Sequence, residues 1–301
     1  MLNRRDFLQA GIGSLIGASS ASARCRRRNR CAPACNDHVN EFVRMRNAII
    51  ADPNIASVRE LIIPDAKKIL VHWEQLHIVV KMTKEEMIMI SDCQKDLYLA
   101  MKSLLRTHPD LLQRILNEGA MLNMENQNAE VILQQLRGKI RAVLLNQFGP
   151  ARIPSPLAEN EFNKGIKDID TLTTVCNNMS PLGVAGGPFT LAYTNGIPVT
   201  GAEYLETDLE CDRLNAIGED EEAERYLYSV REGDVIKIAS QISEAIIHVV
   251  FGCDHDFIKE ILEWNEHHDE KFSLLVARPK TVVKNEGVLW FPMENRPSVA
   301  S

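Results

Sequence analysis

Four side chains that can bind a metal ion lie within fourteen residues near the start of the chain. They are Cys25, Cys31, Cys35 and His38. Thiolate sulfur and imidazole nitrogen are the ligands of tetrahedral zinc sites, and cysteines also hold iron–sulfur clusters. The spacing of these four residues does not follow an established zinc or cluster pattern. Two interpretations therefore stay open: a metal site, or a disulfide that joins Cys35 to Cys31 or Cys25.

A second candidate is the pair Glu74 and His77, which are three residues apart in a segment with helical periodicity. On a helix this spacing puts both side chains on one face. Di-iron carboxylate bundles use two such pairs together with two further glutamates, and this sequence supplies one pair. We therefore expect either part of a metal site in a helical bundle or a surface glutamate beside a hydrogen-bonded histidine.

A third candidate lies near the carboxy terminus. Glu244 and His248 are four residues apart on a predicted helix, and Cys253 and His255 follow closely. Imidazole, thiolate and carboxylate groups at two adjoining helix ends could chelate a divalent ion. Glu263, Glu266, His267 and His268 lie further along the same segment. The alternative is that Asp254 caps a helix and that the adjacent His267 and His268 are solvated.

A segment rich in glycine and proline runs from residue 183 to residue 201. Such a turn can let backbone amides approach a phosphate, but the glycine spacing is not that of a nucleotide-binding loop. Pro188 also removes one amide donor. Asn195 and Gly196 predict the turn of a β-hairpin over residues 189–200. We expect this segment to form part of an exposed binding surface.

Apolar residues recur with helical spacing over most of residues 37–148. Thr83 and Glu86 match a capping box, which predicts the start of a long helix that ends near Thr107. The expected helices span residues 37–50, 64–82, 83–107, 108–119 and 126–148. We therefore predict a mainly α fold, in which residues 37–148 form an antiparallel helical bundle with short connections.

Prolines crowd into residues 149–160, which predicts a linker to a smaller α+β region over residues 161–301. An apolar stripe from Val235 to Val249 predicts a helix that ends at Gly252. Short strands in hairpins are expected at residues 272–277, 281–284 and 288–291, and exposed helices at 202–215 and 219–230.

The chain of 301 residues has an ordinary apolar fraction and a net charge of −7, which is typical of a globular protein. Residues 24–36 form a basic arm that contains five arginines and three of the seven cysteines. No aromatic residue interleaves with these arginines, so stacking on nucleic-acid bases has no support. We expect no nucleic-acid partner. An odd number of cysteines would leave one thiol unpaired, or bound to a metal, in an oxidising compartment.

Residues 1–23 combine paired arginines, an apolar run interrupted by glycines, and a small-residue end. The residues that carry this pattern are Arg4, Arg5, Phe7, Leu8, Ala21 and Ala23. Their order resembles a bacterial twin-arginine (Tat) signal peptide. The resemblance implies that the Tat export machinery and signal peptidase are partners, with cleavage after Ala23. An uncleaved anchor is the alternative, although the run is shorter than the roughly 20 apolar residues that a spanning helix needs.

The sequence therefore predicts an exported protein of the periplasm or cell envelope with a binding or structural role. The alternative is a metal-binding protein, di-iron or otherwise redox-active, that receives its cofactor before export. No Ser-His-Asp or Cys-His arrangement can be assigned from residue order, so the sequence leaves open whether the protein is an enzyme.

Overall fold

The computed structural model of the chain describes residues 32–76, 83–121, 183 and 186–289. Within these residues six strands form one sheet in the order β1-β6-β2-β5-β3-β4. β1 is antiparallel to β6, and every other neighbouring pair is parallel. The strands are β1 (Ile55–Leu61), β2 (Lys68–Gln75), β3 (Ile115–Met121), β4 (Val199–Glu203), β5 (Ile246–Gly252) and β6 (Phe272–Pro279).

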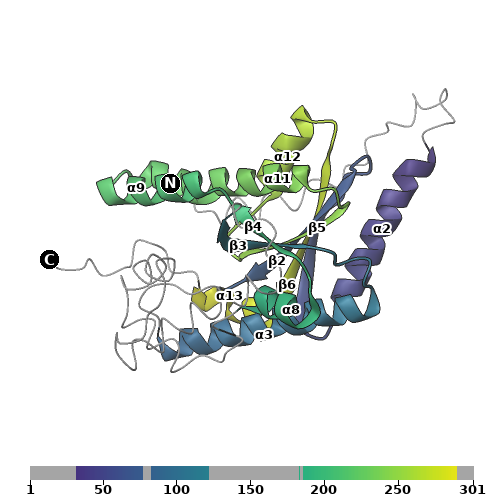
Figure 1. Cartoon of the computed structure of the whole chain (residues 1–301), viewed down its shortest axis with the longest axis horizontal. Helices are drawn as coiled ribbons and strands as arrows, with labels where there is room; N and C mark the ends of the chain where they lie inside the picture. Colours follow the sequence, from purple (N-terminus) through teal and green to yellow (C-terminus); the bar gives the residue numbers. More distant parts are fainter. Residues whose placement is uncertain (1–31, 77–82, 122–182, 184–185, 290–301) are drawn as a thin grey trace.

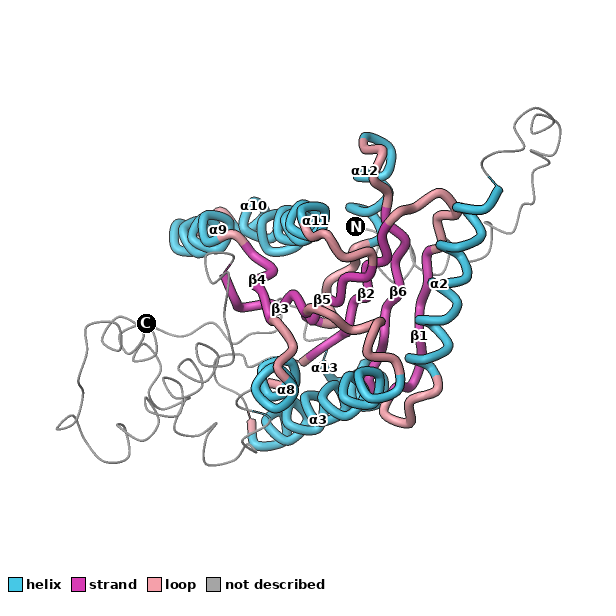
Figure 2. The backbone as a smooth tube through the Cα atoms, turned by 45° about the vertical axis from the view of Figure 1, so that its right-hand side comes forward, coloured by secondary structure: helices cyan, strands magenta, loops and turns pink. Residues whose placement is uncertain are grey.

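Helices cover both faces of this sheet (Figure 1). Figure 2 shows α9, α10 and α11 along one face, and α3 and α8 along the other. The elements on the first face are α9 (Leu205–Ile217), α10 (Asp220–Arg225), the π-helix η2 (Tyr226–Val230), α11 (Arg231–Gln241) and α12 (Ile258–His267). Those on the second are α2 (Ala32–Ile50), α3 (Lys84–Thr107), α8 (Gly187–Asn195) and α13 (Lys280–Leu289). The described residues thus form a three-layer α/β fold.

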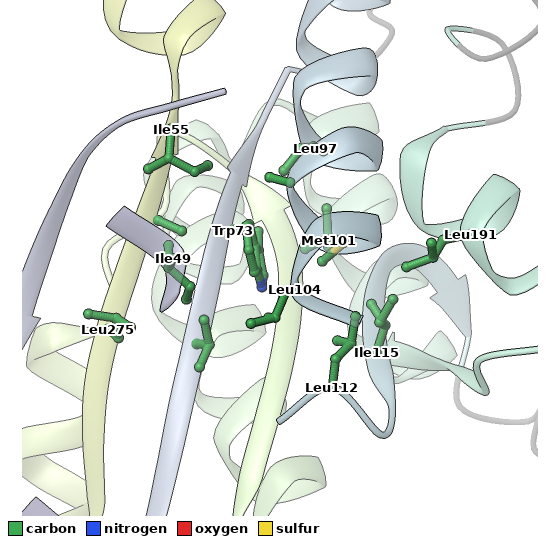
Figure 3. Close-up of a cluster of buried hydrophobic side chains, with 14 of the residues drawn as sticks. Ile49, Ile55, Trp73, Leu97, Met101, Leu104, Leu112, Ile115, Leu191 and Leu275 are labelled. Carbon is green, nitrogen blue, oxygen red and sulfur yellow. The ribbon is translucent and has the colours of Figure 1, made fainter. Parts of the chain in front are cut away.

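The buried side chains divide between the two faces of the sheet. Trp73 of β2 packs with α2, α3 and α8 in one cluster, which Figure 3 shows. Leu70 of the same strand packs with Phe251, Val235 and Ile261 in the cluster under α11 and α12. This alternation places successive residues of each strand in different cores. Burying one such large apolar side chain contributes about 1.5–3 kcal/mol.

The capping box predicted at Thr83 is confirmed. The Thr83 hydroxyl accepts a hydrogen bond from the Glu86 amide, and the Glu86 carboxylate accepts one from the Thr83 amide. These two bonds satisfy amide groups that the first turn of a helix leaves without intrahelical partners. α3 begins at Lys84 and ends at Thr107, as its apolar spacing predicted.

The prediction of a mainly α helical bundle is wrong. Residues 68–75, assigned to a helix, form β2, and every residue of this strand is buried. Residues 115–121, assigned partly to another helix, form β3. A strand covered by helices on both faces has a nearly continuous apolar sequence, which short windows do not distinguish from a buried helix. The predicted helix over 126–148 and the predicted linker over 149–160 lie outside the described residues.

Three predictions in the carboxy-terminal half are also wrong. The expected hairpin over residues 189–200 is instead helix α8 followed by strand β4. Gly196 has a φ of 69° and ends α8 in the left-handed conformation, so it caps a helix rather than turning a hairpin. The predicted helix over 235–252 divides into α11 and β5, and residues 281–284 lie in helix α13 rather than in a strand.

β6 and the helices near residues 205–217 and 220–230 follow the sequence-based expectation. Strands from both sides of the predicted linker contribute to the single sheet, because β1, β2 and β3 precede it and β4, β5 and β6 follow it. Among the described helices, none has the length and apolar character required to span a bilayer.

Candidate functional site

The connection that follows β2 and the connection that follows β5 run to opposite faces of the sheet. After β2 it enters α3, whose Leu97 packs in the same cluster as Trp73. After β5 it enters α12, whose Ile261 packs in the opposite cluster with Phe251. In open α/β sheets, a crevice forms at the carboxyl ends of two adjacent strands whose connections diverge in this way. The carboxyl ends of β2 and β5 are therefore the first place to examine for a ligand site.

Glu118 lies in the middle of β3, level with the carboxyl end of β5, and its side chain reaches across that end. Its Oε2 accepts hydrogen bonds from the Gly252 amide at 2.7 Å and from Gln75 Nε2 at 3.2 Å. The side chain is 8% exposed. Three neighbouring strands thus converge on one carboxylate, because parallel strands end at the same edge.

Arg231 links Glu118 to a second buried carboxylate. Its Nη2 lies 3.0 Å from Glu118 Oε1, and its Nε donates to Glu203 Oε1 at 2.6 Å. The guanidinium is 12% exposed and also lies over the Phe251 ring, 5.3 Å from its centroid. These contacts join α11, β3, β4 and β5.

The π-helix η2 immediately precedes Arg231. π-turns inside longer helices are uncommon and recur at functional sites, since the extra residue changes where the following side chains point. Here the turn from Tyr226 to Val230 determines how Arg231 and Glu232 face the edge of the sheet.

His255 lies between two carboxylates in the loop after β5 and is 2% exposed. Its Nδ1 is 3.0 Å from Glu232 Oε1, and its Nε2 is 3.9 Å from Glu118 Oε1. Because an ionised carboxylate only accepts hydrogen bonds, the first contact places a proton on Nδ1. The Phe251 ring packs edge-on against the imidazole, with centroids 4.6 Å apart. The imidazole is therefore held in one orientation.

These side chains form one group, which we call the carboxyl-edge cluster. Its members are Glu118, Glu203, Arg231, Glu232 and His255. Glu260 of α12 adjoins it: burial, and then the nearby Glu232 carboxyl, raise the pKa of Glu260 to about 7. The named members of the cluster include three carboxylates and one guanidinium, so the cluster favours a further positive charge or a shared proton.

Glu74 lies on β2, so the predicted helix that would align it with His77 is absent. Its carboxylate is 1% exposed and is paired at 2.9 Å with both Arg59 and Arg278. Burial raises the pKa of Glu74, while the two guanidinium groups act in the opposite direction. Glu74 therefore belongs to an ion-pair network across β1, β6 and β2, and His77 lies outside the described residues.

His248 lies on β5 and its ring nitrogens are both occupied. Trp73 Nε1 donates to its Nδ1 at 2.9 Å, and its Nε2 donates to the Leu111 carbonyl at 2.7 Å. Burial lowers the pKa of His248 to about 4, so the ring is neutral at physiological pH. Glu244 pairs with Arg114 instead. The structure therefore does not bring His248 and His255 together.

The cysteine-rich arm lies mostly outside the described residues. This applies to Cys25 and Cys31, while Cys35 is placed only as part of the backbone of α2. His38 Nε2 is 3.0 Å from Ser273 Oγ, and burial lowers its pKa. The described part of the chain contains no group of three or more side chains arranged to hold a metal ion. The disulfide between Cys31 and Cys35 stays a prediction.

The signal-peptide residues lie outside the described residues as well. They are Arg4, Arg5, Phe7, Leu8, Ala21 and Ala23.

Two surface hollows lie away from the carboxyl-edge cluster. One, of about 570 Å³, is lined by the start of α2 and by residues 64–67, and His38 lies on its wall. The other, of about 630 Å³, lies between α3 and α13, with Lys95, Lys280 and Lys284 on its walls. Neither contains a buried group of interacting charges like that at the carboxyl edge, so we take the cluster as the candidate site.

The chain matches no known family model, no curated protein and no solved structure. The candidate site is therefore identified from its geometry alone. Sequence reasoning identified His255 but missed Glu118, Glu203, Arg231 and Glu232. The available signal was a carboxylate within each of two short segments, and using it depends on recognising β3 and β4 as parallel strands.

Proposed function

We propose that the protein binds a small polar ligand that carries positive charge, at the carboxyl-edge cluster. The observation that supports this proposal is the convergence of Glu118, Glu203, Arg231 and His255 beside the carboxyl ends of β4 and β5. Ligands of open α/β sheets bind at this edge. Among the described residues of the cluster, carboxylates outnumber guanidinium groups, which favours a cationic ligand.

The energetic cost of the cluster also supports a functional role. Moving a carboxylate and a guanidinium out of water costs several kcal/mol for each ion, and their mutual attraction often only balances that cost. Apolar side chains of similar volume would stabilise the fold at least as well. A requirement for function accounts for the presence of Glu118, Glu203 and Arg231 where stability alone does not.

A thermal-denaturation screen tests the ligand class. We expect small amines, quaternary ammonium compounds or guanidines to raise the melting temperature, because a ligand that binds only the folded state stabilises it by RT ln(1 + [L]/Kd). Anions of matched size serve as the control. Stabilisation by the anions alone, or by none of the compounds, would contradict the proposal.

We also infer that the protein is exported and acts in the periplasm or cell envelope. The support for this inference is the pattern of Arg4-Arg5, Phe7-Leu8 and Ala21-Ser22-Ala23. The test expresses the full chain in a bacterium with a functional twin-arginine pathway and fractionates the cells. We expect a periplasmic product that starts at residue 24, and cytoplasmic precursor when Arg4 and Arg5 are both replaced by lysine. Equal export of the two forms would contradict it.

A further inference from the structure

The carboxyl groups of Glu232 and Glu260 meet between α11 and α12. The two residues are 5% and 8% exposed, and burial, followed by hydrogen bonding to the Glu232 carboxyl, raises the pKa of Glu260. Glu260 Oε2 is buried, and among the described residues it has no N–H or O–H donor. Two ionised carboxylates repel each other strongly when they are buried and in contact. The contact is therefore favourable when one of the two groups carries a proton.

Glu232 is already the acceptor for two other groups. Its Oε1 accepts from His255 Nδ1 at 3.0 Å and from the Asp256 amide at 3.1 Å. A carboxylate that accepts several hydrogen bonds favours its ionised form. The shared proton therefore belongs on Glu260, which donates to Glu232. Glu232 consequently joins three parts of the chain: α11, the loop after β5 and the first turn of α12.

The remaining charged and titratable groups near the pair do not replace the proton. Lys259 Nζ is 3.3 Å from Glu260 Oε1, but its side chain is 73% exposed and remains solvated. The Tyr228 ring of η2 packs against His255 with centroids 5.3 Å apart. Arg231 is engaged by Glu118 and Glu203. The groups that face the pair are thus Lys259, His255 and Asp256. Beyond His255 lie Tyr228, Glu118 and Asp254.

We propose that Glu232 and Glu260 form a proton-controlled latch that holds α12 and the loop after β5 against α11 and releases them when the shared proton is lost. The raised pKa of Glu260, about 7, places this transition near neutral pH. His255 and the Asp256 amide depend on the same carboxylate, so release also loosens the loop that borders the carboxyl-edge cluster. The latch rests on contacts within the chain and does not require the proposed ligand.

The test uses the full chain and follows individual groups by NMR between pH 4 and pH 9. We expect one carboxyl of the pair to titrate near pH 7 and the amides of α12 to exchange faster above that pH. Glu260→Gln replaces the acid proton with an amide donor that pH does not remove. In this variant the exchange of α12 amides should lose its additional pH dependence.

Glu263→Gln is the matched control, because Glu263 lies on the same helix and is exposed. It should leave the behaviour of α12 unchanged. Should Glu260→Gln fail to fold, Glu232→Gln places the amide donor on the other member of the pair and gives the same expectation. The proposal is overturned if both carboxyls titrate near the ordinary glutamate pKa of about 4.3. It is also overturned if the glutamine variant retains the pH dependence of the wild type.

The free energy of unfolding gives a second readout. A raised pKa favours the protonated folded state, so its contribution is complete below the pKa of the unfolded chain and declines as pH rises toward 7. The unfolding equilibrium of the wild type relative to Glu260→Gln should therefore shift toward unfolding by at most tenfold per pH unit. A constant difference across this range would contradict the latch.

Discussion

At the scale of single residues, each buried charge of the carboxyl edge depends on a specific partner. Arg231 is the clearest case, since two carboxylates from different strands share its guanidinium. Lys68 is similar: its buried ammonium donates to three carbonyl groups at the end of α11 and also pairs with Glu270. Such contacts position side chains more than they add net stability.

Replacing Arg231 with methionine should therefore be strongly destabilising. Glu118 and Glu203 would both lose their cation, and breaking a buried pair costs about 3–5 kcal/mol. The measurement is the free energy of unfolding in urea. Arg213→Met is the control, because its pair with Glu210 lies at the surface, where solvent screening leaves it little effect on stability. Equal losses in the two variants would show that the buried contacts have no special role.

Two buried histidines predict a loss of stability in acid. Burial lowers the pKa of His72 to about 3 and that of His248 to about 4. The unfolded chain binds these protons near pH 6.5, so stability is complete above that value and declines as pH falls toward 4. Over part of this range, protonation of Glu260 increases stability as pH falls and so opposes the effect of the two histidines.

Measuring the urea midpoint from pH 7.5 to pH 4 in the Glu260→Gln background isolates the histidine effect. The decline should be shallower when His248 is also replaced by glutamine, since one of the two titrations is then removed. A midpoint that does not change over this range would show that the two rings are protonated as readily in the folded chain as in the unfolded one.

At the scale of helices and strands, close approach of α8 to α3 requires a glycine. A Cβ at Gly187 would lie 2.8 Å from the Gln94 carbonyl oxygen, and the Gly187 amide donates to Gln94 Oε1. Gly233 lies inside α11, and no atom would come within 4 Å of its Cβ. The close packing of α8 on α3 therefore requires glycine at position 187, whereas packing does not require glycine at position 233.

Gly187→Ala should destabilise the protein, because α8 must move away from α3 to relieve the clash. Overpacking of this kind costs about 1–3 kcal/mol. Gly233→Ala should be neutral or stabilise by up to about 1 kcal/mol, since alanine is the better helix former. Thermal denaturation of both variants distinguishes the two effects, and destabilisation by both would mean that the difference in packing is unimportant.

The helices and strands also differ in how well the sequence predicts them. The start of α3 could be predicted because its signal, Thr83 followed by Glu86, is local. β2, β3 and β5 could not, because their parallel partners are distant in the chain and their apolar runs resemble buried helices. Asn195-Gly196 was ambiguous for another reason: a left-handed glycine suits both a hairpin turn and the end of a helix.

The site was predictable to the same limited extent. His255 was identified as a candidate, but as a metal ligand beside His248, and the two histidines lie in different environments. Glu118 and Glu203 acquire significance only when β3 and β4 are adjacent at one edge of the sheet. Residue types alone do not show this, because the spatial order of the strands differs from their order in the chain.

At the scale of the whole molecule, a three-layer α/β fold has buried charges concentrated at one edge of its sheet. Our proposals together describe a binding protein that is exported in its folded form. The Glu232–Glu260 latch would make the border of the site sensitive to pH. We propose that the ligand binds at the carboxyl-edge cluster.

Calorimetric titration of the wild type and of Glu118→Gln, with the most stabilising cation from the screen, tests that claim most directly. Glutamine keeps an oxygen for the Gly252 amide but removes the negative charge. The matched control is Glu222→Gln, an exposed glutamate of α10. We expect Glu118→Gln to bind at least about tenfold more weakly, a change of about 1.4 kcal/mol, and Glu222→Gln to bind like the wild type. Equal affinity of Glu118→Gln and the wild type would contradict the account.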